Sequence, residues 1–311
     1  MNLKIDRPDA SAGPPQARPA PFIQDRGSAT PKAREATSVG VTVYGGSTRP
    51  PRGDYSRGGI VLADYTCPQN YAAYTPADHD TYCRLYERQS ALLPGLACDE
   101  FIEALPSLGA STRIPRFEDI NERLIKATGW KLVAVPGLIP EVPFFTLLAN
   151  RQFPVTDWIR KPEEFDYIVE PDIFHDLFGH VPLLFNPVFA GHMQAYGAGG
   201  LKAHHLGACE QLARLYWYTI EFGLIRQTDG ESSGLRAYGA GILSSSGELV
   251  HATSSPEPQR EPLDLLRCMS RPYNIDSFQQ TYFVIDSFQQ LFDMTAPDFA
   301  PLYAKMKYEP D

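Results

Sequence analysis

Apolar side chains recur at helical spacing in several stretches after residue 55. The first covers residues 77–92, where Asp78 or Asp80 is the expected N-cap, because a short acidic side chain accepts hydrogen bonds from the first turn of a helix. Residues 98–105 and 117–128 repeat the amphipathic pattern. The pattern therefore predicts that the first half of the folded region is largely helical.

Further along, the pattern combines helices with a few short strands. Gly129–Val135 is short and rich in β-forming residues, which predicts a strand. The prolines of residues 136–143 predict a shaped loop, followed by a helix that begins near Phe144. Two further helices and then a glycine- and serine-rich turn region between short strands are expected at Pro171–Gly179, Gln211–Gln227 and Tyr238–Gly247. The predicted fold class is mainly α with short β-strands (α+β), in a single domain over residues 56–311.

Residues 1–55 differ in composition from the rest of the chain. The first 54 residues hold eight prolines but only two aromatic side chains, Phe22 and Tyr44. Such a segment cannot bury enough apolar surface to offset the entropy lost on ordering, so we predict a disordered Pro/Ala/Arg-rich tail. Its arginines also suit a transit peptide, but the prolines prevent the continuous amphipathic helix of such a peptide.

Composition narrows the class of protein. The 311-residue chain carries a net charge of −9, which argues against nucleic acid as a partner. Its five cysteines are scattered without a CxxC pair, which favours reduced thiols in the cytoplasm over a disulfide framework or a zinc site. No apolar stretch reaches the roughly 20 residues that cross a bilayer, so we expect no membrane partner.

Two histidines and one acid are the strongest candidates for chemistry. His175 and His180 lie five residues apart, and Glu221 interrupts an apolar, aromatic run over residues 212–224. Two imidazoles and one carboxylate on one face of a metal, with the opposite positions open, are the ligands of non-haem Fe(II) oxygenases. Residues five apart point about 140° away from each other on an α-helix. We therefore expect the helix to stop near Gly179 and to let His180 turn back.

A structural role competes with this interpretation. Taken alone, such a histidine pair is more often structural than metal-binding. Burial of Glu221 is costly without a cation or a hydrogen-bonded partner, but Arg214 or Arg226 could supply an ion pair instead. Asp172 and Asp176 are candidate acceptors that would orient imidazole rings around a metal.

Several motifs, in the same order, make the chain resemble a known family. They are Ala127-Thr-Gly-Trp-Lys-Leu-Val-Ala-Val-Pro-Gly-Leu-Ile-Pro140, His175-Asp-Leu-Phe-Gly-His180, Leu215-Tyr-Trp-Tyr-Thr-Ile-Glu-Phe-Gly-Leu224 and Tyr238-Gly-Ala-Gly-Ile-Leu-Ser-Ser245. Together they resemble the tetrahydropterin-dependent aromatic amino acid hydroxylases, above all the bacterial members, over about residues 65–305. The resemblance implies one hydroxylase-type catalytic domain over residues 56–311. It also implies a monomer, without the regulatory domain and tetramer-forming helix of the animal members.

The resemblance implies a role for each site residue. Fe(II) would be held by His175, His180 and Glu221. Arg160, supported by Asp172, would pair with the substrate carboxylate, Trp217 and Phe222 would frame the substrate ring, and Ser244 would support His175. A tetrahydropterin, stacked on Phe144, would lie near Gly137, Leu138, Ile139, Phe144, Asp176, Ala213 and Tyr216. From the residues alone, structural roles are favoured instead: Phe144, Trp217 and Phe222 as core residues, Arg160 in a surface ion pair and Ser244 as a turn residue.

The implied reaction is the hydroxylation of L-phenylalanine to L-tyrosine, with O₂ as co-substrate. A tryptophan or tyrosine hydroxylase would share every ligand. A non-catalytic pterin- or metal-binding protein would keep the same scaffold. A zinc hydrolase also suits the three ligands, but it leaves the pterin loop and the stacking aromatic residues unexplained.

Overall fold

The computed structural model describes Gly53 and residues 62–166, 168, 170–229, 232–275 and 277–308. The tail predicted over residues 1–55 lies outside the described residues, apart from Gly53. The elements of the first half are α1 Pro76–Leu92, α2 Asp99–Ala104, α3 Phe117–Thr128, β1 Lys131–Val135, α4 Glu141–Ala149 and β2 Gln152–Thr156, with 3₁₀ turns at Tyr71–Ala73, Leu105–Leu108 and Pro162–Glu164.

The second half begins with a π-helix, His175–His180, and a 3₁₀ turn, Pro182–Phe185. A second π-helix, Trp217–Glu221, directly continues α6. The remaining elements are α5 Pro187–Leu206, α6 Cys209–Tyr216, β3 Leu224–Asp229, β4 Ser232–Ala237, α7 Ala240–Leu243, α8 Ser246–Ser254, β5 Gln259–Pro262, α9 Leu265–Ser270, β6 Thr281–Ile285, α10 Phe288–Thr295 and α11 Ala300–Tyr308. The predicted class, mainly α with short strands, is confirmed.

The start of α1 differs from the predicted one. Its N-cap is Thr75, not Asp78 or Asp80. The Thr75 side chain accepts from the Asp78 backbone N–H, and the Asp78 carboxylate accepts from the Thr75 backbone N–H at 2.8 Å. This reciprocal capping box satisfies two backbone donors at once, and Pro76 fits the first helical position because its missing N–H is not needed there.

Three other predicted spans need correction. The loop expected over residues 136–143 ends early, since α4 begins at Glu141 with Pro143 in its first turn, where no backbone N–H is required. The helix expected to reach Gln227 ends at Glu221, and β3 follows because its residues pair with β4 and β6. The expected turn region Tyr238–Gly247 contains α7 and the start of α8.

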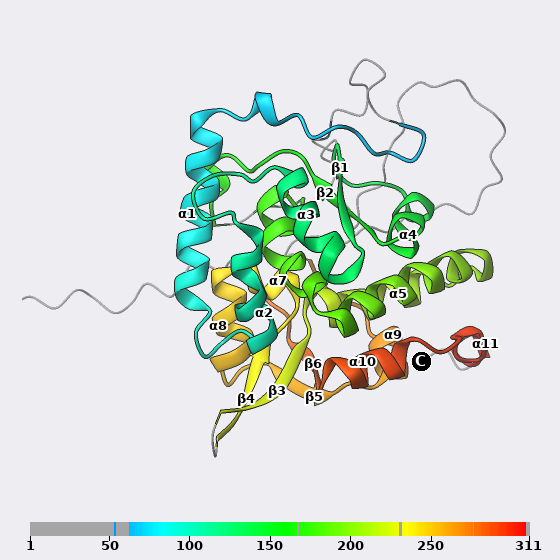
Figure 1. Ribbon diagram of the computed structural model, residues 1–311. Coiled ribbons are helices and arrows are strands. Elements are labelled where there is room, and N and C mark those ends of the chain that lie inside the picture. The colour runs from blue at the N-terminus through cyan, green and yellow to red at the C-terminus, as the bar shows by residue number, and fades with distance from the viewer. Residues whose placement is uncertain are drawn as a thin grey trace, which may run out of the picture.

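Two small sheets flank the helical body. In β1–β2 the strands are parallel, with Lys131 opposite Gln152. The other sheet has the order β4-β3-β6-β5, in which β3 and β4 form an antiparallel hairpin and β6 runs parallel to both β3 and β5. In Figure 1 the two sheets lie on opposite sides of the body, with α5 and α7 between them in this view. Segments from all parts of the described chain thus share one buried core.

Helices α4 and α5 approach each other unusually closely. A Cβ atom on Gly200 would lie 2.1 Å from the Phe145 ring, and one on Gly197 would lie 2.4 Å from the Ala149 backbone nitrogen. Glycine at these two positions lets the helices meet at backbone distance. Among the described residues, no helix combines the length and the apolar character that a membrane span requires.

Candidate active site

The two histidines lie at the first and last positions of a π-helix, which solves the spacing problem in an unexpected way. The helix does not stop near Gly179 as predicted; it widens, and His175–His180 forms one π turn. Because π-helical bonds join residues i and i+5, residues five apart fall on the same side of the turn. Glu221 ends the second π-helix, where the Phe222 backbone N–H donates to the Trp217 carbonyl at 2.8 Å.

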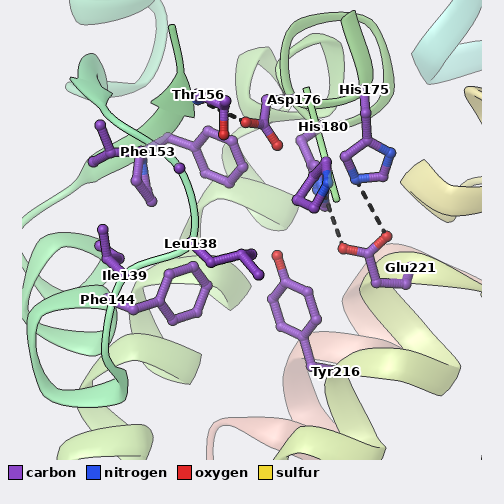
Figure 2. A pocket seen from close by; sticks show the side chains of 14 residues that line it. Leu138, Ile139, Phe144, Phe153, Thr156, His175, Asp176, His180, Tyr216 and Glu221 are labelled. Carbon is purple, nitrogen blue, oxygen red and sulfur yellow. Dashed lines mark hydrogen bonds and ion pairs between the residues drawn. The ribbon is translucent and has the colours of Figure 1, made fainter. Parts of the chain in front are cut away.

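The three side chains converge. His180 Nε2 lies 3.1 Å from one Glu221 oxygen, and His175 Nε2 lies 3.6 Å from the other. Figure 2 shows both imidazoles pointing at the carboxylate, and all three side chains are buried. Separations of this size are those of ligands that share one ion at about 2.0–2.2 Å, because such ligands lie about 3–4 Å apart.

A hydrogen-bond chain sets the protonation of the His175 ring. The Ser244 hydroxyl donates to the Ala240 carbonyl at 2.7 Å, so its oxygen is left to accept from His175 Nδ1 at 2.9 Å. With the proton on Nδ1, Nε2 presents a lone pair toward Glu221, as a metal ligand must. Gly179 allows these hydrogen bonds to form, because a Cβ atom at this position would lie 2.9 Å from the Ala240 oxygen and hold α7 away.

Burial favours the neutral ring of His175. Desolvation lowers the pKa of His175 to about 4, so this imidazole is neutral at neutral pH and able to bind a metal. Burial alone would raise the pKa of Glu221, but the facing His180 and His175 outweigh it and hold that pKa below its usual range. The site therefore offers two imidazoles and one carboxylate anion.

One carboxylate oxygen of Glu221, Oε2, indicates where a cation would bind. Among the described residues, no group hydrogen-bonds to Glu221 Oε2, although this oxygen is buried. A buried carboxylate oxygen without a hydrogen bond is costly, and a coordinated cation removes that cost. The residues present therefore fit a divalent metal with this ligand set.

A cavity adjoins the three candidate ligands, which themselves form part of its lining. Six of the seven residues expected near a pterin line it, and Figure 2 shows Phe144 and Tyr216 across it from the histidines. Ala213, the seventh, is buried one turn before Tyr216 on α6 and does not line the cavity. Sequence reasoning missed five lining residues, which carry no chemical signature of their own: Val135, Phe153, Pro154, Thr156 and Pro171.

Asp176 contributes an acid with an altered proton affinity. Burial raises its pKa to about 7, and its Oδ2 accepts from the Thr156 backbone N–H at 2.7 Å. This hydrogen bond holds the Asp176 side chain against β2 in the cavity wall. Figure 2 shows the contact beside the histidines.

Arg160 and Asp172 form a buried ion pair outside the cavity lining. Asp172 accepts from Nε of Arg160 at 2.8 Å and from its Nη2 at 3.0 Å, and it also accepts from the His175 backbone N–H. Burial favours protonation of Asp172, but the Arg160 charge outweighs it and lowers the pKa of the carboxyl. Nη1 of Arg160 stays outside this two-pronged contact.

Trp217 and Phe222 form an aromatic pair, also outside the cavity lining. Their ring centroids are 4.5 Å apart, and Tyr273 stacks on Trp217 at 4.3 Å. The Trp217 indole N–H donates to the Gln279 side chain at 3.0 Å. Sequence reasoning missed Tyr273 and Gln279, because their partners lie more than 50 residues away in the chain.

Comparison with known proteins defines the class. Residues 64–303 match the biopterin-dependent aromatic amino acid hydroxylases, so the chain belongs to this family. It is 59% identical over 244 residues to a phenylalanine-4-hydroxylase of Chromobacterium violaceum, which covers 78% of this chain and 81% of that protein. It is 54% identical over 302 residues to one from Ralstonia nicotianae, with coverages of 97% and 89%.

A solved structure supports the same assignment. The crystal structure of phenylalanine hydroxylase from C. violaceum bound to cobalt matches with a TM-score of 0.76 and 58% identity, covering 79% of this chain and 88% of that chain. The resemblance inferred from the motifs is therefore confirmed. The individual roles of the site residues stay predictions.

Proposed function

We propose that this chain is a phenylalanine 4-monooxygenase that converts L-phenylalanine to L-tyrosine with O₂, Fe(II) and a tetrahydropterin. The observation that carries the proposal is the convergence of His175, His180 and Glu221 beside a cavity, with one buried carboxylate oxygen lacking a hydrogen bond. The relatives named phenylalanine-4-hydroxylase, at 54–59% identity, support the choice of substrate.

The three ligands would hold the iron on one face and leave other positions open. When bound, Fe(II) and the tetrahydropterin supply the activation of O₂. The protein keeps His175 neutral through burial and Ser244, so that Nε2 is ready to coordinate. The apolar walls of the site restrict water near the reacting groups.

The cavity would hold the pterin. Phe144 would offer an aromatic face to a flat ring, and the loop Gly137–Ile139 lines the same cavity. Gly137 has a φ of 156°, a conformation that side chains rarely adopt. Asp176 lines the same cavity as the three candidate ligands and would accept a hydrogen bond from the pterin or from a water molecule when ionised.

Arg160 would bind the carboxylate of the substrate. Asp172 fixes the guanidinium through two hydrogen bonds and also holds the backbone of His175, so the substrate anchor and a metal ligand share one support. Arginine suits the task because its planar donors match a carboxylate. Trp217 and Phe222 would position the substrate ring near the metal.

Removal of a metal ligand tests the proposal. We expect His175→Ala and Glu221→Ala to abolish tyrosine formation, a loss greater than the roughly 10–100-fold effect of losing an outer support of a metal ligand. The measurement is tyrosine formed from phenylalanine by metal-depleted protein supplied with Fe(II) and tetrahydropterin. His205→Ala, an exposed histidine of α5, is the matched control. Full turnover by a folded His175→Ala protein would refute the iron assignment.

The same assay defines the substrate. Phenylalanine, tyrosine and tryptophan are compared at equal concentrations, and faster turnover of either of the latter two would replace the proposed specificity. Pterin binding without oxidation of any amino acid would indicate a non-catalytic relative.

We further propose that the chain works as a monomer in the cytoplasm, on small molecules and without nucleic acid. All five cysteines are free thiols in the structure, which suits a reducing compartment. Light scattering that gives the mass of one chain, 34.6 kDa, would support the monomer.

A further inference from the structure

A second group of metal-binding side chains lies at the ends of three helices. Glu141 is the first residue of α4, His204 lies in the last turn of α5, and Cys209 is the first residue of α6. Their ligand atoms all lie within 4.8 Å of one another. None of the three belongs to the active site described above.

The separations suit a shared ion better than hydrogen bonds. His204 Nδ1 lies 3.5 Å from Glu141 Oε2 and 3.9 Å from Cys209 Sγ. The first distance exceeds the 2.7–3.2 Å of an ordinary N–H···O bond, and a single ring N–H cannot serve both neighbours well. Tetrahedral zinc places N and O ligands about 3.4 Å apart and N and S ligands about 3.6 Å apart. The nitrogen–oxygen separations in the candidate active site, 3.1 and 3.6 Å, are similar to the 3.5 Å between His204 and Glu141.

The positions of two of the ligands at helix ends also favour their negatively charged forms. Glu141 and Cys209 both lie at helix N-termini, where the helix dipole stabilises a carboxylate and a thiolate. The chain between His204 and Cys209 is a fixed turn, because Gly207 adopts a φ of 66° and the Ala208 N–H donates to the Ala203 carbonyl at 2.9 Å. The close contact of α4 with α5 at Gly197 and Gly200 fixes the third ligand relative to this pair.

We propose that Glu141, His204 and Cys209 form a second metal site that binds a thiophilic divalent cation, Zn²⁺ by preference. One thiolate, one imidazole and one carboxylate are ordinary zinc ligands. The carboxylate is buried, whereas the His204 side chain is 48% exposed, so the fourth position faces solvent and takes water. The site does not depend on the hydroxylase activity.

Occupancy of this site would tie together the helices that shape the cavity. Phe144 follows Glu141 by one turn on α4, and Tyr216 lies two turns after Cys209 on α6. Both aromatic side chains line the cavity, with ring centroids 6.0 Å apart. The second ion would therefore fix the two walls of the pterin cavity relative to each other.

Cobalt binding distinguishes this site from the active site, because only a cobalt–thiolate bond gives an intense charge-transfer absorption. Metal-depleted full-length protein is titrated with Co²⁺, and the bound ions are counted. We expect two ions per chain and a thiolate band in the wild type, and one ion with no band in Cys209→Ser. Cys83→Ser, a half-buried cysteine of α1, should keep both ions and the band. His175→Ala should keep the band whatever its hydroxylase activity.

Zinc added to the cobalt-loaded protein should abolish the band. His204→Asn provides a second variant should Cys209→Ser fold poorly, with His205→Ala as its matched control. A wild-type protein that binds Co²⁺ without a thiolate band would overturn the proposal. So would a band that survives in folded Cys209→Ser or disappears in Cys83→Ser.

Discussion

At the scale of single residues, the active site depends on which nitrogen of His175 carries its proton. Ser244 has one hydroxyl proton and gives it to Ala240, so the His175 ring must donate in turn. The other ring nitrogen, Nε2, which faces Glu221, is therefore unprotonated. Ser244, which is not a candidate ligand, thus determines whether His175 can coordinate a metal.

Substitution of Ser244 tests this dependence. We expect Ser244→Ala to weaken metal binding about 10–100-fold, because the His175 ring loses the acceptor that fixes its tautomer and orientation. Fe(II) titration of tyrosine formation measures the affinity, and excess iron should restore most of the turnover. Ser246→Ala, two residues along the chain, is the control. An unchanged iron requirement in Ser244→Ala would show that the hydrogen bond has no such role.

Which residues the sequence could reveal follows from their chemistry. Histidine and glutamate stand out in an apolar run, so the candidate ligands His175, His180 and Glu221 could be read directly. Thr156 contributes through its backbone N–H and Gln279 through a contact with Trp217 across 62 residues. Neither contact follows from a local sequence pattern, so the sequence alone does not reveal either residue.

At the scale of elements, both segments that carry the candidate ligands are π-helices. Helical periodicity assumes about 100° per residue, so it predicted that His175 and His180 diverge unless the helix ended. Both π-helices pack against α7, a contact between distant segments that sequence periodicity does not contain. The same limit explains why residues 224–227, which closely follow a helix and begin with two apolar side chains, are assigned to that helix from the sequence, although strand pairing makes them part of β3.

The close contact of α4 with α5 can be tested with two neighbouring glycines of α5, one as the control for the other. Gly199→Ala should stabilise the protein by about 0.5–1 kcal/mol, since alanine favours the helix and no described atom lies within 4 Å of the new methyl group. Gly200→Ala gains the same propensity but forces its Cβ into the Phe145 ring, and overpacking costs about 1–3 kcal/mol. Denaturant unfolding of both variants measures the difference.

Gly200→Ala should also weaken pterin binding. Phe145 contacts Phe144 edge to face, with centroids 5.7 Å apart, so a displaced Phe145 ring disturbs the cavity wall. A raised KM for the pterin in Gly200→Ala, and an unchanged one in Gly199→Ala, is the expected pattern. Equal stability of the two variants would contradict the close packing of α4 on α5.

At the scale of the whole molecule, a buried polar network joins the C-terminal region to the aromatic pair Trp217 and Phe222. Glu248 of α8 accepts from the Tyr282 hydroxyl and, at 3.1 Å, from the Gln279 backbone N–H. The Gln279 side chain in turn accepts from Trp217. Desolvation raises the pKa of Glu248 to about 7, so its carboxyl is protonated in mildly acidic solution.

Glu248 should make global stability depend on pH. Because its pKa is higher in the folded than in the unfolded state, its favourable contribution is complete below its ordinary pKa of 4.5 and is lost as the pH rises through about 7. The full difference is up to about 3 kcal/mol. From pH 5 to pH 8, the unfolding free energy should fall more for the wild type than for Glu248→Gln, which cannot ionise. Parallel pH profiles would exclude ionisation of Glu248 as the cause.

The position of Tyr273 and Gln279 along the chain has a consequence for shortened forms of the protein. All three candidate metal ligands precede residue 222, and a fragment that ended near residue 270 would retain them. Such a fragment would lack the ring that stacks on Trp217 and the amide that accepts its indole proton. Such a fragment would also lack β6, the buried strand that lies between β3 and β5. Deletion from the C-terminal end would therefore remove the partners of Trp217 and part of the core together, so single substitutions at Tyr273 or Gln279 are the cleaner way to test the role of the aromatic pair.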